Sequence, residues 1–446
     1  MASFIYKDSP PCVKSELDLF TVPATQTVIE KGQFVEFHPL SSVRDGGPIE
    51  FTISGSGEEY VDLAASYMHV KVKVTKSDGN VLTDTDSVAP VNLFLHSLFS
   101  QVDVSLNERN ISSSTNTYPY RAYIETLLNY GEDAKKSLLT CEGFFKDTQP
   151  DNVNTSRFVK TSTDPAYVLV EGDKGLWDRY NLIKNSQVVD MIGQLHCDIF
   201  QQNRLMINMV DIKIKMIRSK PEFCLVSPTG NGYKVVLEHA SMFIRKVKVN
   251  PAVSIAHAKA LEKTSCKYPI DRVICKTYSI AKGSYSFLQD NVFLGLMPKR
   301  VILTCVGNAA MNGDYTQNPY LFSHHNANSV SIYVDGQPVP TKPLELNFSS
   351  KNYVRAYYSL FSGFHNDKGI YLSKEEYANG YVLYAFDLSP DMCDGEHFNL
   401  QRQGNLRVEI KFSEAIAQTL SVLIYAEFQN VIEISKSRHV LCDFPN

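Results

Sequence analysis

Apolar and polar residues alternate strictly in short segments that recur along the whole chain. Segment 69–74 reads HVKVKV, segment 102–106 reads VDVSL, and segment 210–217 reads VDIKIKMI. Because successive side chains of a β-strand point to opposite faces of a sheet, these segments are predicted to be strands with one buried face. Turn-forming residues separate the segments, so we expect a largely antiparallel β protein.

One pattern of this kind occurs twice. Residues 101–128 read QVDVSLNERNISSSTNTYPYRAYIETLL, and residues 329–361 read SVSIYVDGQPVPTKPLELNFSSKNYVRAYYSLF. Each copy contains an alternating strand, a polar turn, a connection rich in Pro, Ser and Asn, and an Arg-Ala-Tyr segment. The second Arg-Ala-Tyr, at Arg355, follows the first, at Arg121, by 234 residues. A repeat at about half the chain length indicates a duplicated domain.

The duplication, the many short strands and the few helix signals predict an all-β fold: two tandem eight-stranded antiparallel jelly rolls with short helices and long inter-strand loops. Each half has about 220 residues, more than the roughly 100 of an immunoglobulin-like sandwich, which favours the jelly roll. The aperiodic segment 132–187 is predicted to be a large surface loop. The linker is placed at the turn-forming SPTGNG near the midpoint. The predicted division is an N-terminal arm (1–27), a first jelly roll (28–226), a linker (227–232) and a second jelly roll (233–446).

Short helices are predicted at three places between the strands. The first covers 120–130, where aromatic and leucine side chains share one face. The second covers 254–264, with Ser254 as its N-cap. The third begins at a capping box formed by Ser373 and Glu376.

Charge and composition narrow the function classes. The chain has 44 basic and 48 acidic residues, a net charge of −4, and no basic cluster. A protein that coats nucleic acid directly needs clustered positive charge to displace counterions from phosphates, so direct coating is not expected. The nine cysteines include no CxxC pair and predict free thiols in a reducing compartment. We see no signal peptide or membrane-spanning apolar run, so a soluble chain made in the cytosol is expected.

Sequence motifs for catalysis or cofactor binding are missing, since the chain has no GxSxG, HExxH, GxxxxGK[ST] or GxGxxG. Cupin jelly rolls bind metal through closely spaced histidines, for which His324 and His325 are the candidates. Adjacent strand residues point to opposite faces, so we expect loop histidines that share no ion. The remaining histidines are scattered without metal-ligand spacing: His38, His69, His96, His196, His239, His257, His365, His397 and His439.

Three other polar groups have ordinary structural explanations. Cys393 and His397 form the only nearby thiol–imidazole pair, in a polar loop. Glu375 and Glu376 lie in the first turn of a predicted helix, where the helix dipole favours carboxylates. Segment 230–232, GNG, is only a fragment of a phosphate-binding loop. We therefore predict no enzyme and no catalytic, cofactor-binding or metal-binding residues, although a triad assembled from distant positions stays open.

Several long strings carry a resemblance to a known family. Residues 289–303 read QDNVFLGLMPKRVIL, residues 330–348 read VSIYVDGQPVPTKPLELNF, and residues 397–412 read HFNLQRQGNLRVEIKF. These strings, with others over most of 60–435, resemble the major capsid protein of Polinton/Maverick elements and adintoviruses. That protein belongs to the hexon-like, double-jelly-roll family.

The resemblance implies a structural role. It implies that three subunits form a pseudo-hexagonal capsomer, and that capsomers tile an icosahedral shell around double-stranded DNA. It also implies penton and minor capsid proteins as partners and a place in the virion after synthesis in the host cytoplasm. The slightly acidic balance agrees, because a shell subunit need not grip DNA.

Two other functions remain as alternatives. The first is a carbohydrate-binding, lectin-like double β-sandwich, for which Tyr118, Tyr120 and Tyr123 could form an exposed aromatic platform. The echo of these residues at Tyr353 and Tyr357 favours packing in a core instead. The second is a metal-dependent, cupin-like enzyme. A self-assembling capsid subunit is the leading hypothesis.

Overall fold

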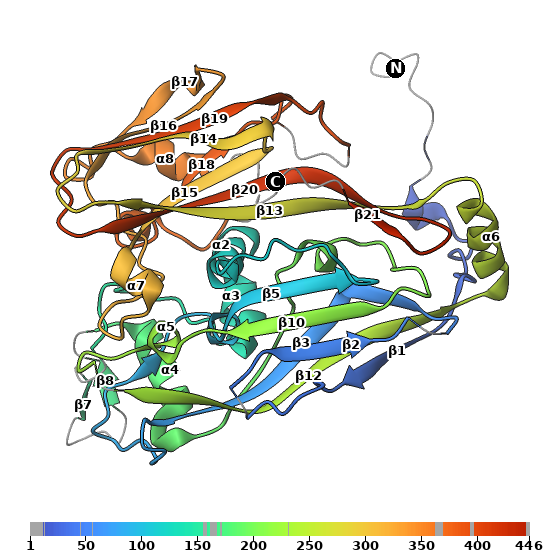
Figure 1. Cartoon of the computed structure of the whole chain (residues 1–446), viewed down its shortest axis with the longest axis horizontal. Coiled ribbons are helices and arrows are strands. Elements are labelled where there is room, and N and C mark those ends of the chain that lie inside the picture. Colours follow the sequence, from blue (N-terminus) through green and yellow to red (C-terminus); the bar gives the residue numbers. More distant parts are fainter. Residues whose placement is uncertain are drawn as a thin grey trace.

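The computed structural model describes the following residues of the 446-residue chain: 12, 14–44, 46–55, 57–154, 158–160, 167–169, 172–230, 232–361, 369–392 and 397–442. These residues form two β-sandwiches, each made of two antiparallel sheets (Figure 1). The alternating segments predicted as strands do form strands, and their apolar members fill the two cores. Val70, Val72 and Val74, for example, are fully buried.

The first sandwich contains two four-stranded sheets. One sheet has the order β1 (Ile29–Phe37), β12 (Tyr233–Val249), β3 (Tyr60–Lys76) and β9 (Val189–Gly193). The other has the order β2 (Ile49–Ile53), β10 (Ile212–Arg218), β5 (Phe99–Leu106) and β6 (Arg109–Asn110).

The second sandwich repeats this arrangement. One sheet has the order β13 (Cys266–Ile280), β20 (Leu420–Ile434), β15 (Arg300–Gly307) and β18 (Tyr384–Asp387), and β21 (Val440–Cys442) also pairs with β20. The other has the order β14 (Ser286–Leu296), β19 (Gln403–Phe412), β16 (Ala327–Val334) and β17 (Gln337–Glu345). Two small ribbons complete the described strands: β4 (Ala89–Pro90) with β11 (Leu225–Val226), and β7 (Phe158–Lys160) with β8 (Tyr167–Leu169).

Strand order identifies each sandwich as a jelly roll. In both, one sheet joins the first, eighth, third and sixth main strands, and the other joins the second, seventh, fourth and fifth. Two stacked four-stranded sheets with this connectivity are the jelly-roll arrangement. The predicted fold class of two tandem eight-stranded jelly rolls is therefore confirmed.

The structure places the boundary between the jelly rolls after β12 and not at the predicted turn. The turn at 227–232 was expected to separate the jelly rolls, but β12 follows it and pairs with β1 and β3 of the first sandwich. The true connection is 250–265, which contains α6 (Pro251–Leu261). The turn signal at 227–232 is real, but it precedes the eighth strand of the first jelly roll. Sequence pattern shows where a strand lies and not which sheet it joins.

The predicted helices are present, with one change of start. Helix α2 (Tyr118–Asn129) matches the first prediction, and α9 (Lys374–Ala378) begins with the predicted Ser373–Glu376 capping box. Helix α6 begins earlier than expected because Asn250, not Ser254, caps it by accepting from the Ala252 N–H at 2.9 Å. Further helices are α1 (Phe94–Ser97), α5 (Pro221–Cys224), α7 (Asn308–Asn312), α8 (Val354–Ser359) and the 3-10 helices Ser15–Leu17, Lys184–Ser186 and Asp198–Phe200.

The prediction of a large surface loop at 132–187 is wrong for the described part of that segment. It contains α3 (Glu132–Lys136), a 3-10 helix η2 (Leu138–Glu142) and α4 (Lys174–Ile183). Asp173 caps α4, and the buried Arg179 guanidinium lies 2.7 Å from Asp147. These pieces are too short for helical periodicity to emerge from the sequence alone.

Helix α2 lies between the two sandwiches (Figure 1). Nearly all of its side chains are buried, which fits a helix covered on every side. Each described cysteine is a free thiol, as predicted. Among the described residues, no helix is both long and apolar enough to span a membrane.

The close approach of α4 to the preceding chain gives a stability prediction. A Cβ at Gly175 would lie 2.5 Å from the carbonyl oxygen of Lys146, so Gly175→Ala should lower the free energy of unfolding by about 2 kcal/mol through overpacking. Gly47→Ala is the control, because a Cβ there meets open space. Urea unfolding followed by circular dichroism measures both. Equal stability of the two variants would contradict the packing described here.

Candidate functional site

The two adjacent histidines lie in the turn before β16 and have separate surroundings. The His324 ring stacks on Phe348 with 4.2 Å between ring centroids, and its Nδ1 accepts from the Asn326 N–H at 2.9 Å. His325 is half-buried, and burial lowers its pKa to about 4. Both histidines thus lie outside a strand, in a loop.

The other polar candidates are also held by structural contacts. Glu376 accepts from Lys146 Nζ at 2.7 Å and from the Ser373 N–H at 2.8 Å. Exposed His397 contacts Asp391 with 2.7 Å between Nε2 and Oδ2. Cys393 and Asn231 lie outside the described residues, so the predictions about the thiol–imidazole pair and the GNG fragment have no structural counterpart here.

The tyrosines that could have formed a sugar-binding platform are buried. Tyr118, Tyr120 and Tyr123 all lie on α2 and have almost no exposed surface. The Tyr123 ring stacks on Tyr320 of the second jelly roll, with 4.2 Å between centroids, and Tyr120 meets the same ring edge to face. This aromatic platform is therefore internal and cannot contact a glycan.

The structure builds its most elaborate polar site around Glu125 of α2. The Glu125 carboxylate is 3% exposed and accepts from Arg121 Nε at 2.8 Å and Gln201 Nε2 at 2.6 Å. Its other contacts are His196 Nδ1 at 2.6 Å and the Tyr425 hydroxyl, from the second jelly roll, at 3.3 Å. Burial alone would raise the pKa of Glu125, but Arg121 and His196 lower it to about 2. Glu125 is therefore a carboxylate with a donor from each jelly roll.

The same network continues through Asp198. The Asp198 carboxylate lies 2.6 Å from Arg121 Nη1 and accepts from the Val273 N–H, on β13 of the second jelly roll, at 3.3 Å. Burial raises the pKa of Asp198, and Arg121 opposes that shift. A buried charge is costly unless it is paired, so these contacts fix how the two sandwiches meet.

Further contacts join the chain after α2 to the second jelly roll. Lys135 Nζ donates to the carbonyl oxygens of Leu127 at 2.7 Å and Ile370 at 2.5 Å. The Tyr381 hydroxyl donates to the Asp147 carbonyl oxygen at 2.7 Å. Burial, with a contribution from Lys146, lowers the pKa of Lys135 to about 7. The junction therefore combines these paired polar contacts with the aromatic packing between α2 and the second jelly roll.

A second polar cluster lies beside this network and was missed by sequence reasoning. His96, Glu142 and His196 each offer one ligand atom, and these atoms lie within 4.8 Å of one another. In the sequence the two histidines show no metal-ligand spacing, because 100 residues separate them. Only the tertiary fold brings them together, so no spacing signal could have revealed the cluster.

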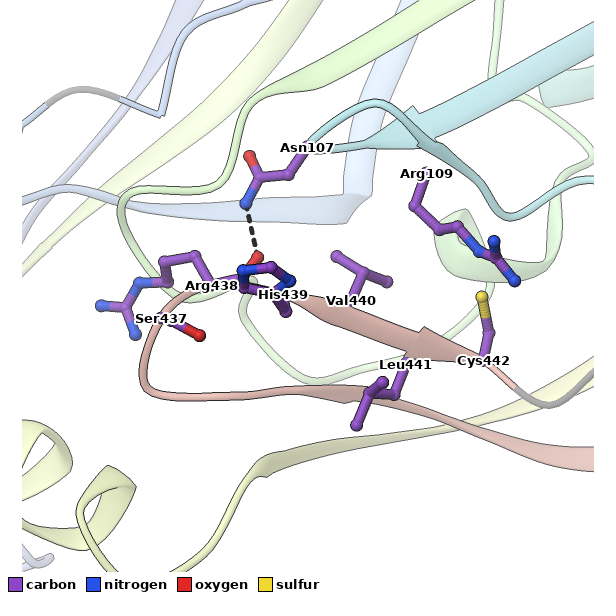
Figure 2. Close-up of a pocket in the computed structure, with 8 residues that line it drawn as sticks. All are labelled: Asn107, Arg109, Ser437, Arg438, His439, Val440, Leu441 and Cys442. Carbon is purple, nitrogen blue, oxygen red and sulfur yellow. Dashed lines mark hydrogen bonds between the residues drawn. The ribbon is translucent and has the colours of Figure 1, made fainter.

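An open groove of about 780 Å³ lies between the jelly rolls (Figure 2). Asn107 and Arg109 come from the β5–β6 turn of the first jelly roll, and the opposite wall is the C-terminal segment 437–442. Asn107 Nδ2 donates to the Arg438 carbonyl oxygen at 2.8 Å across it. The groove thus owes its shape to the contact between the two jelly rolls.

The chain before β1 is exposed along its described length. Every residue of 14–28 is exposed, and these residues include the apolar Leu17, Leu19, Phe20 and Val22. Phe20 is 96% exposed. Clustered exposed apolar side chains mark surfaces that bind other proteins. The described part of the predicted arm at 1–27 therefore presents several exposed apolar side chains.

Comparison with known proteins shows which other chains share this architecture. No family model matches the chain. It is 24% identical over 444 residues to an uncharacterised protein of Caenorhabditis elegans, covering 95% of this chain and 99% of that relative. At this identity the relative supports common descent without identifying a function.

Solved structures resemble the chain over nearly its whole length. The Sputnik virophage structure matches with a TM-score of 0.64 and 12% identity, over 98% of this chain and 93% of that chain. The PBCV-1 virus capsid matches with a TM-score of 0.56 and 11% identity, over 96% and 100%. The mavirus major capsid protein matches with a TM-score of 0.52 and 11% identity, over 99% and 96%. The chain has the fold of viral major capsid proteins. This fold is one chain carrying two jelly rolls.

Glu125→Ala should be strongly destabilising, because it leaves Arg121 with one fewer buried partner and removes the partner of His196 Nδ1. We expect a loss of about 3 kcal/mol in the free energy of unfolding. Glu262→Ala is the matched control, since Glu262 forms an exposed ion pair with Lys436. Urea unfolding measures both variants, and a loss below about 1 kcal/mol for Glu125→Ala would contradict a central role for this network.

Lys135 gives a pH prediction. Its folded-state pKa of about 7 lies below the ordinary 10.5, so between these values the unfolded chain binds a proton that the folded chain releases. The contribution of Lys135 to stability should therefore rise with pH above about 7, and Lys135→Met should lack this contribution. The free energy of unfolding of wild type, relative to that of Lys135→Met, should increase by about 2 kcal/mol from about pH 6 to about pH 9.

Urea unfolding across this pH range measures the difference, with Lys136→Met as the control. Lys136 is the exposed neighbour whose ion pair with Glu132 raises its pKa, so it stays charged throughout the range. A difference for Lys135→Met that does not change with pH would show that Lys135 titrates normally in the folded chain.

Proposed function

We propose that this chain is a major capsid protein related to those of Polinton/Maverick elements and adintoviruses. Three copies form a pseudo-hexagonal capsomer, and capsomers assemble into an icosahedral shell around double-stranded DNA. The chain then acts as a structural protein of the virion and not as an enzyme. The observation that carries the proposal is the pair of jelly rolls with matching strand order in one chain.

Duplication of the jelly roll suits a hexagonal shell. Three chains with two similar domains each present six similar lateral faces, although the symmetry is threefold. The full-length likeness to the Sputnik, PBCV-1 and mavirus capsid structures supports this use of the fold. The relative in C. elegans, which extends over nearly the whole chain, favours an element carried in animal genomes.

The surface of the single chain supports assembly. Leu19 and Phe20 of the arm have no cover in the monomer, and a neighbouring subunit would supply it. A net charge of −4 fits a subunit that surrounds DNA without binding it tightly. Penton and minor capsid proteins would fill the remaining positions of the shell, after synthesis of the chain in the host cytoplasm.

The lectin-like alternative required an exposed aromatic platform, and the residues predicted to form it are not exposed. Its aromatic platform was to be formed by Tyr118, Tyr120 and Tyr123, which are buried between the jelly rolls. Self-association therefore explains the exposed apolar surface better than sugar binding does.

Light scattering of the purified full chain tests the proposal. We expect a mass of about three times 50.2 kDa, held at micromolar concentration and physiological salt by an obligate interface of more than about 2,000 Å². A monodisperse monomer under these conditions would contradict it.

Substitutions in the arm test where the subunits meet. The double variant Leu19→Ser, Phe20→Ser should weaken association, within or between capsomers, by at least roughly tenfold, because it removes two apolar side chains from a contact. Glu16→Ser is the control, an exposed polar residue of the same arm. Analytical ultracentrifugation reports both steps of association. Unchanged association of the double variant would show that the arm is not part of the contact between subunits.

A further inference from the structure

Three segments far apart in the sequence converge beside α2. His96 lies in α1, Glu142 ends η2, and His196 follows β9. Their exposed fractions are 0%, 7% and 7%. Gly193 permits this approach, since a Cβ there would lie 2.7 Å from the Glu142 carboxylate. The local sequence thus makes room for an acidic side chain against two buried imidazoles.

Each histidine has one ring nitrogen occupied by a residue of α2. His96 Nδ1 lies 2.9 Å from the Tyr118 hydroxyl, and His196 Nδ1 lies 2.6 Å from Glu125 Oε2. This leaves Nε2 of each ring for another partner. Metal-binding histidines are oriented in the same way, with the second nitrogen held by a carboxylate or another polar group that fixes the tautomer.

The atoms that face one another lack ordinary partners. His96 Nε2 and Glu142 Oε2 are buried and only 3.3 Å apart, yet neither makes a hydrogen bond of acceptable geometry with another described residue. Buried polar atoms are nearly always paired in native proteins. A cation between the imidazoles and the carboxylate would satisfy both atoms at once.

We propose that His96, His196 and Glu142 bind a divalent transition-metal ion, with Zn²⁺ as the best fit. Two imidazole nitrogens and one carboxylate oxygen form a ligand set that Zn²⁺ favours, whereas Ca²⁺ and Mg²⁺ require oxygen ligands. A water molecule or a neighbouring group would complete the coordination. The ion ties α1, η2 and the segment after β9 together in the first jelly roll.

The site is coupled to the junction between the jelly rolls. Glu125, which orients His196, is also the carboxylate that accepts from Arg121 and contacts Tyr425 of the second jelly roll. Metal binding would therefore stabilise the fold of the subunit and hold α2 against both sandwiches. This role is structural and is independent of whether the subunit builds a shell.

Metal analysis of the full chain, purified without a histidine tag from zinc-supplemented medium, tests the proposal. We expect about one zinc ion per chain by plasma mass spectrometry. Removal by a chelator should lower the melting temperature by several degrees, and added Zn²⁺ should restore it while Mg²⁺ should not. A wild-type chain that carries no zinc and shows no thermal response to added Zn²⁺ would overturn the proposal.

Glu142→Gln separates a metal site from a simple polar contact. Glutamine has the same shape and can hydrogen-bond to His96 Nε2, so without a metal role the variant should behave like wild type. We expect it instead to lose most of its zinc and its thermal response to Zn²⁺. His397→Gln is the control, because His397 is an exposed histidine beside a carboxylate. Equal zinc content in Glu142→Gln and wild type would also overturn the proposal, and if the variant fails to fold, the wild-type zinc measurement still decides.

Discussion

The ion pair between Arg121 and Glu125 is the interaction on which the rest of the structure depends. Both residues lie on α2, which is covered on every side; Arg121 also contacts Asp198, and Glu125 also accepts from Tyr425 of the second jelly roll. Two buried charges are costly to desolvate and stay in place only if every partner is correctly positioned. The ion pair therefore favours one relative orientation of the two sandwiches over slightly different orientations.

The second copy of the repeat lacks the ion pair that α2 carries. Arg355 corresponds to Arg121, but α8 is largely exposed, and among the described residues Arg355 donates to the carbonyl oxygens of Lys342 and Pro343. Four residues later the first copy has Glu125, whereas the second has Ser359. The duplicated domains thus kept their strand order and diverged at the helix that one of them places between the two.

Much of the fold could be predicted from the sequence, because strand alternation and turn residues are local signals. The predicted boundary between the jelly rolls was wrong because the sequence pattern of β12 is like that of the other strands. Only its pairing with β1 and β3 assigns it to the first jelly roll. The burial of Tyr123 agrees with the expectation from its repetition at Tyr357, which favoured packing in a core. The cluster of His96, Glu142 and His196 could not be foreseen, since it depends on contacts among three distant segments.

Cryo-electron microscopy of the purified assembled protein tests the central claim most directly. The account predicts a particle with threefold symmetry and six similar towers or lobes, in which each chain supplies two jelly rolls held at one angle by α2. Density for single chains, or for dimers in which the two jelly rolls adopt variable orientations, would contradict it.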